Sequence, residues 1–316
     1  MLPVRYRLAD LLVTLAVVVA LGTAVAGVRR QAQDDSVIIG CSAKMRQLAQ
    51  ALVMYQSLSN GEFPRTRYDP AKPLTAFTNP DAADPFSDAG PQPNDTSAAM
   101  FLLARTIDLP PEAFICPGAT RNNLAEEDDF DRQTARQRSN FRARLHDNYS
   151  LANMYPSVAA VAAGYSLDSF ATKLPATFVI ASDTNPGGPG PKVATTQMSR
   201  RDMRQANSPN HERDGQNVMF ADGSVQFFNS PFVGTDHDNV FTSQLSPDNL
   251  QPAGAADSVL LPAWSDGPQL TARATVNRRW VLAVGGTGIL LVMAWIVRHG
   301  MRNDLMQREQ SSSPSP

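Results

Sequence analysis

Histidine and cysteine are scarce in this chain, and their scarcity limits the chemistry that the protein can perform. The 316 residues include four histidines and two cysteines, Cys41 and Cys116. The two cysteines are far apart in sequence and neither has a histidine near it, whereas zinc sites are built from closely spaced ligands of these types. The chain also lacks the HExxH, GxSxG, P-loop and glycine-rich dinucleotide motifs. We therefore expect no enzymatic activity, no zinc site and no cofactor.

An excess of charge of one sign is lacking as well. Lysine and arginine together number 28, against 30 aspartates and glutamates, which leaves a net charge of −2. Domains that bind nucleic acids usually carry a clear excess of basic residues. We therefore expect no nucleic-acid partner.

Apolar runs of membrane length, in contrast, are present at both ends of the chain. Residues 8–28 carry one charge, Asp10, and suffice to cross a hydrocarbon core of ~30 Å as a helix. We predict an N-terminal transmembrane segment at residues 1–30, with Asp10 close enough to the interface to reach the lipid headgroups. The alternative is a secretory signal peptide, cleaved after the A-x-A motif at residues 24–26.

The second apolar run, residues 280–297, contains no charged residue, has a tryptophan near each end and is flanked by arginines. It predicts a C-terminal transmembrane helix at residues 278–298, with a proline- and alanine-rich tether at 246–277 before it and a polar tail at 299–316 after it. A buried core helix is the alternative. Two spans would place both termini on the same side of the membrane, but the balanced flanking charges do not decide which side.

Residues 31–245 are expected to form the main domain, which begins with an amphipathic segment. Apolar residues recur there at steps of three and four: Ile38, Cys41, Met45, Leu48, Leu52 and Tyr55. This spacing is typical of one face of an α-helix. No proline separates the segment from the first apolar run, so both would belong to one helix about 70 Å long that ends near residues 59–61.

The rest of the domain is rich in proline and predicts short elements. Residues 98–107 favour a helix on the core, and residues 177–182 favour a buried strand. The strongly charged stretch 122–148 favours an exposed helix or loop.

The clearest hairpin joins residues 217–221 to residues 224–229 through a type I′ turn at Asp222 and Gly223. One face of this hairpin should then carry four apolar side chains, those of Val218, Phe220, Val225 and Phe227.

The hairpin belongs to the most specific motif in the chain, residues 210–227 (NHERDGQNVMFADGSVQF), in which ten residues separate His211 from Asp222 and Gly223. Shorter motifs accompany it in the order CSAKMRQL (41–48), NGEFP (60–64), FICP (114–117), PFVG (231–234) and DNVFT (238–242). This ordered set resembles a bacterial family of prepilin-like proteins, similar to type IV pilins and type II secretion pseudopilins. The family is named for a histidine that precedes Asp-Gly by about nine residues.

The resemblance implies an α+β, pilin-like fold, in which a long N-terminal helix packs on an antiparallel sheet and the domain faces outward from the cytoplasmic membrane. Asp10 stands at the acidic position of the prepilin N-terminus, whereas Arg5 replaces the glycine that precedes the usual cleavage site. Processing of the N-terminus is therefore left open. The implied partners are membrane lipid and either other pilin-like subunits or a second copy of this chain.

Few side chains are candidates for a site. We expect His211 to hydrogen-bond the backbone at the base of the hairpin. A divalent cation would be held by His211 with Asp214 and Asp222, or by residues 236–238 (DHD), if these loops converge. Asp183, at the end of a predicted strand, would either join such a site or cap a turn, and the cap is the simpler interpretation.

Cys41 and Cys116 leave two alternatives open. In an oxidising compartment they would form a disulfide that closes a loop of about 75 residues, and the chain-entropy model gives such a cross-link roughly 4–5 kcal/mol of stabilisation. Otherwise they are two buried thiols.

The leading functional hypothesis is a membrane-anchored, pseudopilin-like structural or envelope-organising protein that is not an enzyme. The alternative is an extracytoplasmic module, held by two membrane anchors, that binds a cation or a glycan.

Overall fold

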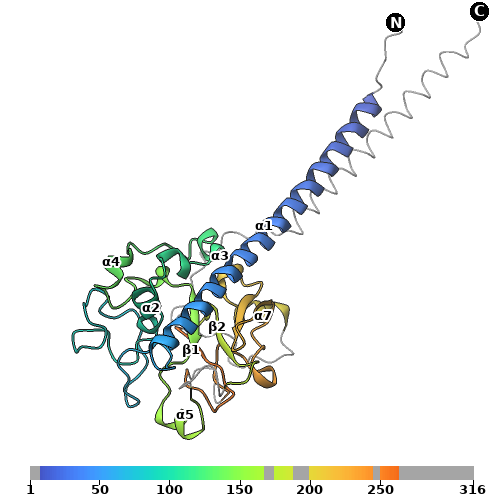
Figure 1. Ribbon diagram of the computed structural model, residues 1–316. Coiled ribbons are helices and arrows are strands. Elements are labelled where there is room, and N and C mark those ends of the chain that lie inside the picture. Colours follow the sequence, from blue (N-terminus) through green and yellow to red (C-terminus); the bar gives the residue numbers. More distant parts are fainter. Residues whose placement is uncertain (1–7, 167–173, 188–198, 245–249, 263–316) are drawn as a thin grey trace, which may run out of the picture. The chain divides into compact units, whose positions relative to one another are not determined.

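The computed structural model describes residues 8–166, 174–187, 199–244 and 250–262. The chain divides into two compact units, and within the N-terminal part the boundary lies between Asp34 and Asp35. Helix α1 (Leu8–Leu58) contributes residues to both units (Figure 1). The second predicted span and the polar tail, residues 278–316, lie outside the described residues, as does Arg5.

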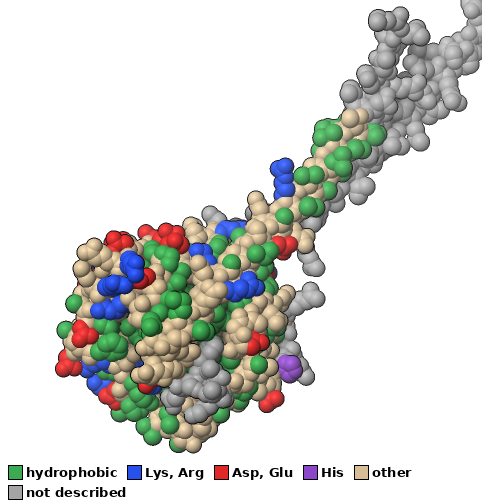
Figure 2. Space-filling model, in the orientation of Figure 1, with side chains coloured by type: hydrophobic (Ala, Val, Ile, Leu, Met, Phe, Trp, Pro, Cys, Tyr) green, Lys and Arg blue, Asp and Glu red, His purple; other side chains and the backbone are tan. Residues whose placement is uncertain are grey.

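The first part of α1 is apolar and exposed, as the sequence predicts. Its most apolar stretch has a mean hydropathy of 2.1, and none of that stretch is buried. Large side chains such as Val18 and Val28 are 59% and 70% exposed. Figure 2 shows hydrophobic side chains along the surface of this part of the helix. Among the described residues this is the one helix long and apolar enough to cross a membrane. Asp10 lies near the start of this helix.

The second part of α1 buries the amphipathic face that the sequence predicts. Cys41, Met45, Leu48 and Leu52 are fully buried, and they belong to one hydrophobic core with residues of helix α2 (Thr96–Ile107) and of the sheet. The helix ends at Leu58, and the backbone then turns through positive φ angles at Asn60 and Gly61. The Gly61 N–H donates to the carbonyl oxygen of Gln56 at 2.8 Å, which caps the last turn.

The sheet has five antiparallel strands in the order β4-β3-β2-β1-β5. Their bounds are β1 (Tyr149–Ala152), β2 (Val179–Asp183), β3 (Gln216–Phe220), β4 (Val225–Phe228) and β5 (Leu260–Leu261). The fold is therefore α+β, with a long apolar N-terminal helix and an antiparallel sheet. Strands β2, β3 and β4 fall close to the predicted positions, whereas β1 and β5 have no counterpart in the predictions.

Strand β5 corrects the predicted domain boundary at residue 245. Residues 250–262 were expected to belong to the tether at 246–277, but Leu260 and Leu261 pair with β1. Val259 and Leu260 are fully buried. This apolar triplet closes the free edge of β1, so the domain continues at least to residue 262.

The hairpin between β3 and β4 forms, but its turn and register differ from the prediction. Only Gly223 has a positive φ, +80°, whereas a type I′ turn needs positive φ at both central residues. Two hydrogen bonds between Phe220 and the turn, from Gly223 N–H and to the Ser224 carbonyl, define a three-residue loop. The extra residue shifts the pairing by one position compared with a two-residue turn.

The shifted register changes which side chains share a face. Met219 now pairs with Val225, and Asn217 pairs with Phe227. Phe220 lies on the other face, where its ring contacts Phe228 with the centroids 6.0 Å apart. The prediction that Val218, Phe220, Val225 and Phe227 line one face is therefore wrong. The shift places Asn217 on the same face as Phe227, which matters for the site.

The helices outside α1 are short, as expected for a proline-rich chain. Helix α2 (Thr96–Ile107) confirms the predicted core helix and begins at Asp95, whose side chain accepts from the Ala98 N–H. The remaining helices of the described residues are η1 (Pro111–Phe114), α3 (Pro117–Arg121), α4 (Arg132–Ala135), η2 (Arg144–His146), α5 (Val158–Ala162), α7 (Arg200–Ala206), η3 (Pro209–His211) and η4 (Thr235–His237).

The charged stretch 122–148 is only partly the exposed segment that the sequence predicts, because most of its charged side chains are exposed but several other residues are buried. Phe130 and Phe141 are buried in it and contact the rings of Phe101 and Phe114, with centroids 5.0–6.5 Å apart. Its charges include a buried ion pair, whose Arg138 and Asp128 side chains are 6% and 2% exposed. The interior of the domain therefore contains the two phenylalanines and the Arg138–Asp128 ion pair of this stretch.

Candidate functional site

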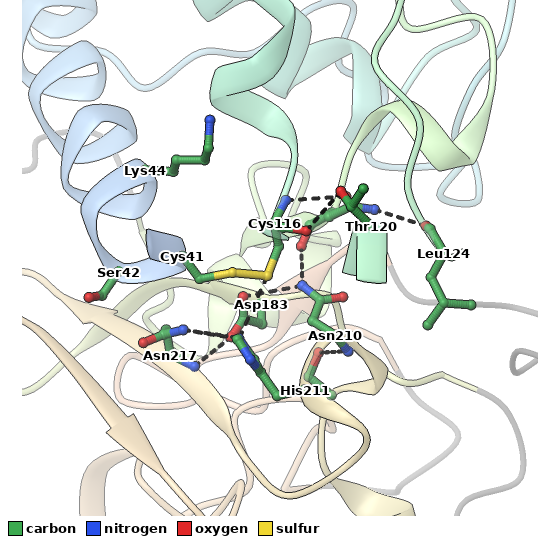
Figure 3. The surroundings of a disulfide bond; sticks show 12 residues. Cys41, Ser42, Lys44, Cys116, Thr120, Leu124, Asp183, Asn210, His211 and Asn217 are labelled. Atoms are coloured by element: carbon green, nitrogen blue, oxygen red, sulfur yellow. Dashed lines mark hydrogen bonds and ion pairs between the residues drawn. A yellow bond between two sulfur atoms is a disulfide. The ribbon is translucent and has the colours of Figure 1, made fainter. Parts of the chain in front are cut away.

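A disulfide links α1 to the segment that precedes α3. Cys41 and Cys116 are both fully buried, and their Cα atoms are 5.1 Å apart (Figure 3). Of the two alternatives that the sequence leaves open, the structure forms the disulfide. The bond fixes the amphipathic part of α1 to the domain.

His211 lies beside this disulfide, at the end of η3 (Figure 3). Its Nε2 atom is 3.6 Å from Cys116 Sγ, 3.1 Å from Asp183 Oδ2 and 3.2 Å from Asn217 Nδ2. The expectation that His211 hydrogen-bonds the backbone is therefore wrong for this nitrogen, since all three neighbours are side chains. The edge of the Phe227 ring closes one side, with ring centroids 5.5 Å apart.

Gly118 leaves room for the imidazole of His211 because it has no side chain. A Cβ atom at this position would lie 2.9 Å from His211 Nδ1 and 2.5 Å from the Asn210 carbonyl oxygen. Both distances are too short for a real contact, so α3 packs this closely on η3 only because residue 118 is glycine.

Asp183 is the last residue of β2 and is fully buried. Its Oδ2 atom accepts from the Asn217 backbone N–H at 2.6 Å and from Asn217 Nδ2 at 3.1 Å. Its Oδ1 atom accepts from Asn210 Nδ2 at 3.2 Å. The interpretation of Asp183 as a turn cap is therefore wrong, because this carboxylate joins the groups around the disulfide.

The four residues Cys41, Cys116, Asp183 and His211 form what we call the Cys–His–Asp cluster. Their potential ligand atoms all lie within 4.8 Å of one another, and all four residues are buried. Among the described residues this is the one group of three or more histidines, cysteines and acidic residues that is close enough to hold a metal ion. The premise that neither cysteine has a histidine near it holds in sequence but not in space.

The structure does not bring the predicted cation ligands together. Asp214 is 65% exposed and forms an ion pair with Arg204 at 2.8 Å. Asp222 is exposed and accepts from the Ser224 N–H at 2.8 Å, and its hydrogen bonds with Ser224 lower the pKa of its carboxyl. Neither belongs to the Cys–His–Asp cluster, so His211 is the one member of the predicted set that does.

The second predicted loop, residues 236–238, follows a different pattern. Asp236 and His237 are exposed and have positive φ angles. Asp238 is partly buried, and this burial, together with the nearby Asp257, raises the pKa of its carboxyl to about 8. Among the described residues, this loop does not belong to any group of three or more ligand residues that is close enough to hold a metal ion.

The buried carboxyl of Asp147, just before strand β1, predicts a pH effect on the stability of the fold. Burial raises the pKa of Asp147 to about 8, and one of its oxygens has no partner. Between pH ~4, the usual value for aspartate, and pH ~8, the folded state keeps a proton that the unfolded state has lost, so stability falls as pH rises. We expect Asp147→Asn to raise the free energy of unfolding at pH 7 by on the order of 2 kcal/mol.

Urea denaturation of the wild type and of Asp147→Asn at pH 5 and pH 8 measures this effect. In the wild type the Tyr149 N–H donates to the Asp147 carboxyl at 3.2 Å, and the side-chain oxygen of the asparagine can accept the same hydrogen bond. The gain should be larger at pH 8 than at pH 5. An equal difference at both values would show that ionisation of Asp147 is not its cause.

A separate cavity of about 300 Å³ lies near the end of α1 and is lined by residues that include Phe63, Arg65, Tyr68 and Tyr165. The Arg65 guanidinium lies 4.9 Å from the centroid of the Tyr68 ring. Stacking on Tyr68 holds the arginine at the edge of the cavity.

The sequence did not reveal Asn210 and Asn217 as site residues, although both lie within the motif around His211. Their role depends on Asp183, the last residue of β2, which lies more than twenty residues earlier in the chain. An asparagine on each side of a histidine in a hairpin motif was the available signal.

Comparison with known proteins finds no matching family model, no matching curated protein and no matching solved structure. The resemblance to prepilin-like proteins therefore rests on the sequence motifs and stays a prediction.

Proposed function

We propose that this protein is a membrane-anchored structural protein of the prepilin-like kind, with no enzymatic activity of its own. In this proposal the first part of α1 lies in the cytoplasmic membrane and the domain faces outward. Other pilin-like subunits, or further copies of this chain, associate with it through the apolar helix.

The observation that carries the proposal is the difference in surroundings between the two parts of α1. Its first part exposes apolar side chains and buries none of its most apolar stretch. Its second part belongs to the core, where four consecutive face positions from Cys41 to Leu52 are fully buried. Such a helix has one half that requires lipid or another apolar surface and one half that holds a domain.

The disulfide supports a location outside the cytoplasm. Disulfides persist in oxidising compartments and are uncommon where thiols are kept reduced. The Cys41–Cys116 bond cross-links α1 to the segment that precedes α3, so it would keep the helix packed on an outward-facing domain.

Photo-crosslinking in native membranes tests the proposed association. A photoreactive amino acid replaces Val18, which is 59% exposed on the apolar part of α1. We expect crosslinked species that contain a second copy of this chain or another pilin-like subunit, since association brings the apolar helices together. The matched control position is Val158, a valine of the domain that is 64% exposed. Crosslinks to lipid alone at Val18, or equal protein crosslinking at both positions, would contradict the proposal.

The mature N-terminus decides between two forms of the proposal. Mass spectrometry of the protein from native membranes would find a start at Tyr6 if a prepilin peptidase cuts after Arg5. An intact Met1 would indicate a permanent anchor and would argue against filament assembly. A start at Gly27 would show a cleaved signal peptide and would overturn membrane anchoring through α1.

A further inference from the structure

We propose that the Cys–His–Asp cluster binds one zinc ion when its disulfide is reduced. The ligands would be the two thiolates, the imidazole and the carboxylate, supplied by Cys41, Cys116, His211 and Asp183. This inference does not depend on the proposed structural function, because it concerns the interior of the domain.

Two of the six distances among the four ligand atoms are close to those of a tetrahedral zinc site, and all six are within 4.8 Å. With Zn–S near 2.3 Å and Zn–N and Zn–O near 2.1 Å, a sulfur and a nitrogen ligand lie about 3.6 Å apart, and a nitrogen and an oxygen ligand about 3.4 Å apart. The observed distances from His211 Nε2 are 3.6 Å to Cys116 Sγ and 3.1 Å to Asp183 Oδ2. Reduction lets the two sulfur atoms separate towards the ~3.8 Å of a zinc site.

The Nε2 atom of His211 lies between an acceptor and a donor, and it can hydrogen-bond only one of them. Asp183 Oδ2 is an acceptor, so a hydrogen bond to it requires Nε2 to donate, whereas Asn217 Nδ2 is a donor, so a hydrogen bond from it requires Nε2 to accept. One nitrogen cannot do both. A zinc ion takes the lone pairs of both Nε2 and Oδ2, and the Asn217 amide can still donate to the Asp183 carboxylate, which it already contacts at 3.1 Å.

Burial of Asp183 also favours a bound cation. This carboxylate is fully buried, and its hydrogen-bond and ion-pair contacts come from His211 and from the amides of Asn210 and Asn217. A buried carboxylate is costly unless a positive charge compensates it. The asparagines would also orient the carboxylate, which is the task of the groups that surround metal ligands.

The two states of the cluster are connected by balanced chemistry. A dithiol reductant transfers two electrons and two protons to the Cys41–Cys116 bond, and its own sulfurs form a disulfide. Zinc then displaces the two thiol protons as the thiolates bind it. The ion would then bridge Cys41 and Cys116 in place of the disulfide, so α1 stays cross-linked to the segment that precedes α3 in both states.

Zinc retention by the full-length chain in detergent micelles tests the proposal. The protein is reduced with dithiothreitol, freed of reductant by gel filtration under argon, incubated with zinc chloride and filtered again. Elemental analysis then gives the zinc content per chain. We expect about one zinc per reduced chain and none in the oxidised chain, because the disulfide occupies both sulfur ligands.

Ligand variants locate the ion. His211→Ala and Asp183→Asn should lower the zinc affinity of the reduced chain at least tenfold, measured by competition with a chromophoric chelator. The matched control is His237→Ala, which removes an exposed histidine outside the cluster. A loss of zinc in His237→Ala but not in His211→Ala would place the ion elsewhere and overturn the proposal.

Cobalt(II) gives a test that does not depend on any variant. Bound to the reduced wild type, it should show the visible bands of a tetrahedral ion and a charge-transfer band from the thiolates. A reduced chain that keeps its native circular dichroism but binds no zinc, or binds cobalt without thiolate charge transfer, rules the site out.

Discussion

Removal of the Cys41–Cys116 disulfide is expected to lower the free energy of unfolding by about 4 kcal/mol. The bond joins residues 75 positions apart, so it removes many conformations from the unfolded chain. In the double variant Cys41→Ala/Cys116→Ala, this constraint is lost while both buried positions stay apolar. Guanidinium denaturation of the full-length chain in detergent, followed by circular dichroism, measures the change.

Reduction of the wild type provides the control. With reductant and a strong chelator present, the wild type should unfold at the midpoint of the double variant, and the double variant itself should not change. The chelator matters because zinc, if it binds the reduced cluster, would restore part of the lost stability. Equal midpoints for oxidised wild type and double variant would show that the bond does not constrain the unfolded chain.

Arg138→Met is expected to cost about 3–5 kcal/mol, because it leaves the Asp128 carboxylate buried without its partner. The two guanidinium nitrogens meet the two carboxylate oxygens of Asp128 at 3.0 and 2.8 Å, in the bidentate arrangement. Methionine keeps the contact with the Phe101 ring, over which the guanidinium carbon lies at 5.5 Å. The loss therefore reports the charge of Arg138 and its hydrogen bonds, which also reach Asp129 and the Asn140 carbonyl oxygen, rather than its packing.

An exposed arginine of the same segment is the matched control. Arg142 pairs with Asp81 and Asp129, but its side chain is 45% exposed. Arg142→Met should therefore change stability by less than about 1 kcal/mol. If both variants lose the same free energy, burial of the Arg138 pair is not what makes it important.

The Arg138 effect should shrink at low pH. Burial acts to raise the pKa of Asp128, but the hydrogen bonds and charge of Arg138 outweigh it and hold the pKa below the ordinary value. The stability from this pair is therefore fully present above pH ~4 and is lost as pH falls through the folded-state pKa. Denaturation at pH 7 and pH 3 should show the gap between wild type and Arg138→Met narrowing.

The sequence alone determined the elements whose information is local. The apolar run at the start of α1, the buried face from Cys41 to Tyr55 and the turn at Asn60 and Gly61 follow from composition, periodicity and a helix-ending glycine. Helix α2 and strands β2, β3 and β4 were predictable for the same reason. Each of these signals is complete within about twenty residues.

Only the tertiary structure decided the features that depend on distant segments. The pairing of β5 with β1 could not be predicted because two leucines in a proline-rich stretch look like part of a linker until an open strand edge is known. One additional residue in the β3–β4 turn reversed the facing of β4 relative to β3 and brought Asn217 to the side of Phe227.

The Cys–His–Asp cluster is the clearest case. Its members lie at positions 41, 116, 183 and 211, on four segments that meet only when the domain folds. Sequence spacing therefore indicated no zinc site at the two cysteines, and it grouped His211 with Asp214 and Asp222, which the fold turns towards solvent. Residue types were visible in the sequence, but their distances in space are set by long-range packing.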